Sequence, residues 1–132
     1  MVIFDSSIYV DDFRTGRFSE QMAEIGDLVR TSSVVLAELW RGATSTAERE
    51  FLIWLAGHNP VLTPTENNWI ESGQILQRVQ QDHGFEAKKL RDLHFDALIA
   101  LTARTAGARL ITSNRADFEL IREYREFKLE VW

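Results

Sequence analysis

Short apolar runs alternate with longer amphipathic segments along this chain. The apolar runs predict buried strands at residues 2–4, 30–33, 60–64, 108–112 and 127–132. The segments between them predict helices at residues 6–13, 18–29, 34–42, 46–56, 65–81 and 93–106, with a loop and a short helix at 113–121. Such alternation indicates an α/β fold with a mainly parallel central sheet.

Several residues indicate where the predicted helices begin and end. Thr46 is a plausible N-cap, Thr65 begins a long amphipathic helix, and Gly42 and Gly84 end the helices that precede them. The inner side of the long helix is expected to consist of Ile70, Ile75, Leu76 and Val79.

Composition narrows the class of protein. The 132 residues, 45% apolar and 27% charged, are typical of one globular domain, residues 1–132. No apolar stretch is long enough to cross a membrane, no signal peptide is recognisable, and cysteine is absent, so we expect a cytoplasmic protein. The net charge of −5 argues against a broad basic surface for nucleic acid, but it leaves room for a small local site.

Three acidic residues occupy positions that should be apolar. Asp5 directly follows the first apolar run, at the strand end where ligands bind in parallel sheets. Glu38 shares a helix face with Val34, and Asp96 shares one with Ile99. A buried carboxylate is costly unless it is paired, hydrogen-bonded or bound to a metal, so the three anomalies indicate a common site.

A fourth acid, Asp117, lies three residues after Asn114, just beyond a predicted strand. Carboxylates that converge in a cleft repel one another, so they need a cation. The set contains only oxygen ligands, because the chain has no cysteine and no histidine at metal-ligand spacing (His58, His83 and His94 are expected on the surface or in loops). Oxygen ligands favour Mg²⁺, with Mn²⁺ as the alternative.

Each acid also has a simpler interpretation. Asp5 can be interpreted as a helix cap, and Asp96 as an early-helix acid that the helix dipole favours. Glu38 would take part in a structural ion pair, and Asn114 with Asp117 resembles a capping box. The metal hypothesis rests on the combination of acids rather than on any one of them.

Three stretches resemble the PIN-domain ribonucleases, most closely the VapC-like toxins of bacterial toxin–antitoxin operons. They are the apolar strand that ends in Asp-Ser-Ser, the stretch SSVVLAELWRGA, and the stretch HFDALIALTARTAGARLITSNRADF. Their order and spacing cover essentially the whole chain. Asp-Ser-Ser departs from the commoner Asp-Thr-Asn of the family.

The resemblance implies a three-layer α/β/α sandwich with a magnesium-dependent acidic pocket. Asp5, Glu38 and Asp96 correspond to the family's main acids, and these three with Asp117 would be the catalytic and metal-binding residues. The family places the fourth acid at the position of either Asn114 or Asp117, and we favour Asp117. The residues expected to orient the acids are Ser6, Thr112 and Asn114.

The resemblance further implies an endoribonuclease that hydrolyses RNA with the help of a metal, the toxin of a toxin–antitoxin pair. It would form a homodimer and bind a cognate antitoxin, which lays a peptide over the pocket. Arg115, Arg91, Lys88 and Lys89 are the candidates for holding the RNA backbone.

Two other functions remain open. The first is an inactive PIN-like module that binds RNA or protein without cleaving it. The second is a phosphatase or phosphotransfer domain with Asp5 as nucleophile, although the Asp-x-Asp signature of one such family is missing.

Overall fold

A five-stranded, all-parallel sheet forms the centre of the molecule. The computed structural model describes residues 1–132 in full, and the strands lie in the order β3-β2-β1-β4-β5. The strands are β1 (Val2–Phe4), β2 (Val29–Ser32), β3 (Val61–Leu62), β4 (Arg109–Thr112) and β5 (Leu129–Val131). The predicted α/β fold with a parallel sheet is therefore confirmed.

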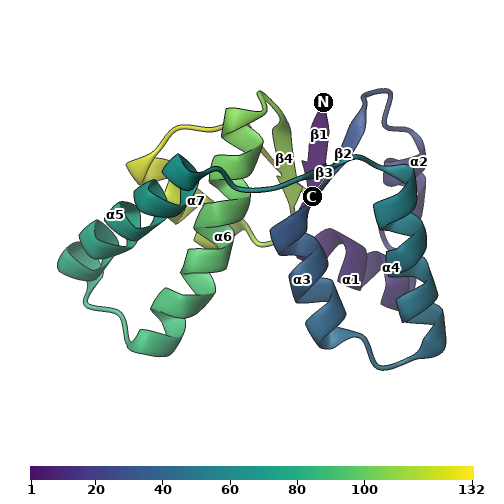
Figure 1. Ribbon diagram of the computed structural model, residues 1–132, viewed down its shortest axis with the longest axis horizontal. Coiled ribbons are helices and arrows are strands. Elements are labelled where there is room, and N and C mark those ends of the chain that lie inside the picture. Colours follow the sequence, from purple (N-terminus) through teal and green to yellow (C-terminus); the bar gives the residue numbers. More distant parts are fainter.

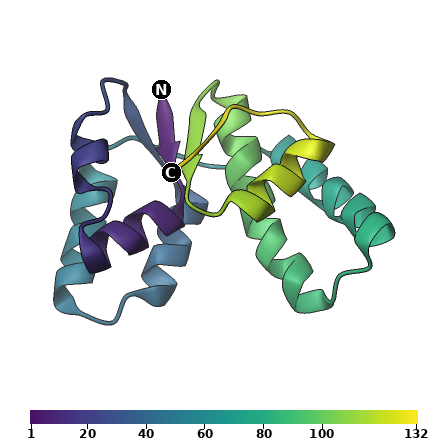
Figure 2. The same ribbon diagram turned by 180° about the vertical axis from the view of Figure 1, so that it is seen from behind.

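Helices cover both faces of this sheet. They are α1 (Ser6–Thr15), α2 (Ser19–Ala23), α3 (Ser33–Gly42), α4 (Thr46–His58), α5 (Glu66–His83), α6 (Ala87–Thr105) and α7 (Arg115–Tyr124). Helices α3, α4, α5 and α6 lie in front of the sheet in Figure 1, and α1 and α7 lie on the opposite side, nearest the viewer in Figure 2. The expected three-layer sandwich is confirmed. No helix combines the length and apolarity that a membrane crossing requires.

The central strand β1 explains why the first apolar run does not alternate with polar residues. It pairs with β2 through Val2 and Ile3 and with β4 through Val2, Ile3 and Phe4. All three side chains are buried because helices cover both faces of the strand. The chain leaves the sheet at Asp5, whose backbone N–H donates to the carbonyl of Ile111 at 2.8 Å.

Two predicted helix boundaries were wrong. The helix predicted at 18–29 is only the short α2, because Val29 pairs with Val2 and draws the preceding residues toward the sheet. Helix α6 begins at Ala87 rather than at residue 93. Leu90 is the only large apolar residue between Ala87 and residue 92, and it packs against the core. One such residue is too few to reveal hydrophobic periodicity, so this part of the helix was not predicted.

The inner side of α5 begins with polar residues rather than with Ile70, which is exposed. Asn68 donates to the Thr105 hydroxyl of α6 at 3.0 Å, and the Ser72 hydroxyl lies 2.9 Å from His94 Nε2. Ile75 and Val79 are buried below them, as predicted. His94 is therefore not the surface or loop residue we expected: it is partly buried between two helices, and burial lowers its pKa.

The N-cap of α4 is Ser45, one residue before the predicted Thr46. The Ser45 hydroxyl accepts from the N–H of Glu48 at 3.1 Å and donates to its carboxylate at 2.9 Å. We expect Ser45→Ala to lower the free energy of unfolding by about 1 kcal/mol, because an exposed helix-start N–H loses its acceptor. Urea denaturation measures the change. Thr46→Ala is the matched control and should change stability by less than about 0.5 kcal/mol; equal losses in both variants would contradict the assignment.

Candidate active site

Asp5 lies at the carboxyl end of β1, and its carboxylate is only 3% exposed. It occupies the N-cap position of α1, yet its side chain accepts no hydrogen bond from the backbone N–H groups of that helix, so the capping interpretation does not account for its carboxylate. Two hydroxyls donate to its Oδ2 instead, from Ser7 at 2.7 Å and from Thr112 at 2.8 Å. Because β4 pairs with β1, the neighbouring strand end brings Thr112 to Asp5.

Ser7 was not among the residues predicted to orient the acids. Its hydroxyl lies 3.2 Å from the Thr112 hydroxyl and accepts from the N–H of Ser113 at 3.1 Å, so it joins α1 to the end of β4. Ser6 lies 3.5 Å from both Asp5 Oδ1 and Glu38 Oε1, at the outer limit for hydrogen bonds. A hydroxyl two residues after an aspartate is the signal that points to Ser7, since such side chains bond locally in turns and helix starts.

Glu38 faces Asp5 from the middle of α3. Helix α3 begins after Ser32, whose hydroxyl accepts from the N–H groups of Val34 and Val35. Burial and the nearby Asp5 carboxylate raise the pKa of Glu38 to about 7, and the charge of Arg41, one turn further along, opposes the rise. Glu38 forms no salt bridge within 4.0 Å, so the alternative interpretation as a structural ion pair does not account for it. The i, i+3 spacing of Glu38 and Arg41 in the sequence already indicates that the two side chains are neighbours on the helix.

Of the two acids whose pKa is raised, Asp96 has the higher value. It lies near the middle of α6, so the interpretation as an early-helix acid was wrong, and it is 9% exposed. Burial and the charges of Asp5, Glu38 and Asp117 raise the pKa of Asp96 to about 8. Lys89 opposes this rise through its charge, and no hydrogen bond to the Asp96 carboxylate stabilises its ionised form.

Asp117 has partners on both carboxylate oxygens. Lys89 Nζ lies 2.6 Å from Oδ1, and Asn114 donates its side-chain amide to Oδ2 at 3.1 Å. Asn114 occupies the N-cap position of α7 without a side-chain capping bond, so the expected capping box does not form. Its backbone N–H instead donates to the Thr112 hydroxyl at 2.9 Å, which places Asn114 beside the Asp5 hydroxyl network.

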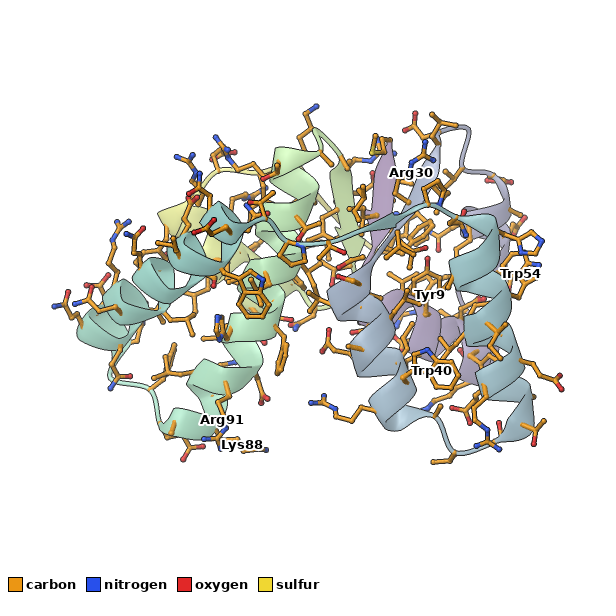
Figure 3. The ribbon with its side chains drawn as sticks, viewed as in Figure 1. Tyr9, Arg30, Trp40, Trp54, Lys88 and Arg91 are labelled. Carbon is orange, nitrogen blue, oxygen red and sulfur yellow. The ribbon has the colours of Figure 1, made fainter.

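Only one of the four predicted RNA-binding cations contacts the acids. Figure 3 shows Lys88 and Arg91 at the end of α6 that is farthest from the sheet, and both are exposed. Arg115 pairs with Glu119 on the surface of α7 at 3.0 Å. Of the four cations, only Lys89 contacts one of the acids. We refer to Asp5, Glu38, Asp96 and Asp117 below as the acid cluster.

The donor chemistry of the acid cluster suits a hard divalent cation. Its carboxylates come from four separate elements, and burial together with their mutual repulsion raises two of their pKa values. As the side chains stand, no group of three or more acid or histidine side chains is arranged to hold a metal ion. Glu38, Asp96 and the Oδ1 atom of Asp5 lack a strong hydrogen-bond or ion-pair partner. Their carboxylate oxygens, near the carboxyl ends of the strands, are therefore available to a cation.

A parallel sheet with acids gathered at the carboxyl ends of its strands defines an α/β protein whose candidate site is acidic. The PIN domain model matches residues 2–124, and the chain belongs to the PIN domain family. No curated protein matches the sequence.

Solved structures share this fold. VapBC-1 from nontypeable Haemophilus influenzae aligns with a TM-score of 0.72 and 20% identity, covering 100% of this chain and 98% of that one. VapBC2 from Rickettsia felis, bound to a promoter DNA fragment, aligns with a TM-score of 0.71 and 22% identity, covering 100% and 99%. VapBC-5 from Mycobacterium tuberculosis, of the VapBC family of toxin–antitoxin systems, aligns with a TM-score of 0.67 and 21% identity, covering 99% and 98%. The fold expected from the resemblance is thus confirmed.

The raised pKa values predict how the stability of the metal-free protein changes with pH. Between about pH 4 and pH 8 the folded protein binds more protons at Glu38 and Asp96 than the unfolded chain does, so stability falls as pH rises through that range. We expect Asp96→Asn to flatten this fall and to be more stable than the parent at pH 8, by roughly 2 kcal/mol.

Urea denaturation in a chelating buffer at several pH values measures this effect. The control is Glu24→Gln, at an exposed acid that should leave the pH profile unchanged. A parent protein that gains stability steadily from pH 5 to pH 8 would contradict the prediction.

Proposed function

We propose that this protein is a metal-dependent endoribonuclease that hydrolyses phosphodiester bonds of RNA. The observation that carries the proposal is Asp96: a nearly buried acid in the middle of a helix, without a hydrogen-bond donor, among three other carboxylates. Such an arrangement destabilises the protein unless a cation compensates it. A costly cluster of this kind is typical of a functional site.

In this proposal Asp5 and Asp96 hold Mg²⁺ most directly, with Mn²⁺ as an alternative, and Glu38 and Asp117 complete the acid cluster. When bound, the metal would coordinate the substrate phosphate and lower the pKa of a water. Ser7 and Thr112 fix the orientation of the Asp5 carboxylate, because both hydroxyls donate to the same oxygen and leave Oδ1 turned toward Ser6 and Glu38.

We propose that the protein is the toxin of a toxin–antitoxin pair and acts in the cytoplasm. The fold shared with VapBC structures supports this assignment. An apolar groove of about 420 Å³ between α1, α3 and α4 offers a surface for the antitoxin. Phe13 and Phe51 line it, and the acids Glu38 and Glu48 outnumber the one base, Arg14, so it suits an apolar peptide with a basic side chain directed toward the acids.

A homodimer is part of the same proposal. Four large apolar side chains are exposed on α3, α5 and α6: Trp40, Trp69, Ile70 and Phe95. Arg41 lies over the ring of Phe95 at 5.9 Å, which connects α3 to α6. Exposed apolar area of this kind supports an interface with a second copy.

The alternative function is a catalytically inactive PIN-like module that binds RNA or protein. Such a module would have no need of the strained carboxylates at Asp96 and Glu38, so their presence favours the enzyme.

Replacement of the metal-holding acids separates these functions. We expect Asp5→Asn and Asp96→Asn each to reduce Mg²⁺-dependent RNA cleavage at least about 100-fold, because each removes charge that holds the metal and the phosphate. Gel analysis of RNA cleavage, with sequencing of the ends, measures the loss. Glu24→Gln is the control and should cleave like the parent. Cleavage by Asp96→Asn at the parental rate would eliminate the metal-site proposal.

The antitoxin proposal predicts that a small protein encoded immediately upstream forms a complex with this chain. We expect Phe13→Glu to weaken that complex at least about tenfold, because a charge enters the apolar groove. Phe13 is 47% exposed, so the fold should tolerate the change. Ile53→Glu, at a 65% exposed residue of α4 outside the groove, is the matched control. Equal affinities for both variants by calorimetry would place the partner elsewhere.

A further inference from the structure

One cationic side chain, that of Lys89, forms an ion pair with a member of the acid cluster. Lys89 Nζ lies 2.6 Å from Asp117 Oδ1, and this is the only salt bridge that any member of the acid cluster forms. The lysine side chain is 37% exposed and Asp117 is 19% exposed, so water screens the pair only in part. Lys89 therefore belongs to the site rather than to the solvated surface around it.

Helix geometry explains why Lys89, and not its neighbours, reaches the acids. Residues 89, 93 and 96 lie on one face of α6 by the i, i+4, i+7 rule. Leu93 on that face is fully buried and Asp96 is nearly so. Lys89 lies about 10 Å below Asp96 along the helix axis. Lys88 and Arg91 are on other faces and point to solvent (Figure 3).

Asp117 is internally satisfied, unlike Asp96. Lys89 occupies one of its oxygens and the Asn114 amide occupies the other. A metal ion at Asp117 would compete with a charged hydrogen bond, which is among the stronger polar contacts in proteins. No such contact protects Asp96 or Glu38.

We propose that Asp117 is not a metal ligand but a positioning residue that anchors Lys89, and that Lys89 binds a phosphate of the RNA at the acid cluster. The inference rests on the proposed ribonuclease function and assigns a role to the fourth acid. An ammonium group has three N–H donors. The structure uses one of them for Asp117, and the other two remain for phosphate oxygens.

The repulsion between an RNA phosphate and the carboxylates explains why a lysine is useful at this place. An RNA phosphate that approaches four carboxylates is repelled unless positive charge meets it at the entrance. Lys89 supplies one such charge at a fixed place, because the Asp117 ion pair restrains a side chain that would otherwise be flexible.

A charge-neutral double variant tests the assignment of Asp117. Lys89→Met/Asp117→Asn removes one positive and one negative charge, so the net charge near the metal stays constant. We expect its Mn²⁺ affinity, measured by calorimetry, to stay within about threefold of the parent. Glu71→Gln/Arg125→Met is the matched control, since it removes a surface ion pair of 2.9 Å between α5 and the end of α7.

RNA binding tests the role of Lys89. The probe is a fluorescently labelled, mixed-sequence single-stranded RNA, measured by anisotropy in Ca²⁺ under conditions where gels show it intact. We expect Lys89→Met to weaken binding and to reduce the slope of log K against log salt by about 0.7, the effect of one lost phosphate contact. Lys89→Arg should keep the slope, because it keeps the charge. Asp117→Asn should weaken RNA binding as well.

The outcomes separate this inference from the function on which it rests. A double variant that loses Mn²⁺ affinity tenfold or more, as Asp96→Asn should, would make Asp117 a metal ligand. A salt slope that Lys89→Met leaves unchanged would remove Lys89 from the RNA contact. Mn²⁺ affinity that even Asp96→Asn leaves unchanged would overturn the proposed metal site itself, whatever Lys89 does. Thermal melts identify any variant that fails to fold, and Lys89→Gln, which also removes the charge, then carries the test.

Discussion

The repulsion among buried carboxylates is the constraint on which the rest of this structure depends. Asp5, Glu38, Asp96 and Asp117 come from four different elements, and only a rigid framework can hold like charges together against their tendency to separate or to bind protons. The framework is the parallel sheet, whose central strand ends at Asp5 and whose neighbour β4 ends at Thr112. Packing energy elsewhere in the core offsets the cost of the site.

The two kinds of polar group at the site have different functions in this balance. Hydroxyls from Ser7 and Thr112 fix the orientation of the Asp5 carboxylate, because both donate to the same oxygen. Asp96 has no such donor, and burial and the neighbouring acids raise its pKa to about 8. One carboxylate is therefore held by hydrogen bonds within the protein, whereas the other needs a cation from outside.

Sequence reasoning found the strands and the acids because both depend on local patterns. The apolar run before Asp5 and the inward position of Glu38 are visible as breaks in periodicity. It failed where tertiary contacts decide the outcome. Pairing between Val29 and Val2 shortened α2, and core packing of Leu90 extended α6 backward to Ala87. The pairing of Asp117 with Lys89 was likewise out of reach, because Lys89 lies 28 residues away in the chain and becomes a neighbour only through packing of α6 on α7.

The polar seam between α5 and α6 has a consequence for the site. Hydrogen bonds at two levels, Asn68 to Thr105 and Ser72 to His94, specify the axial register of the two helices more closely than apolar packing alone would. A shift of α6 by one residue would turn its side chains through about 100°. Asp96 and Lys89 would then both turn away from the acid cluster, so these two hydrogen bonds fix the alignment of the candidate site from the opposite side of the helix.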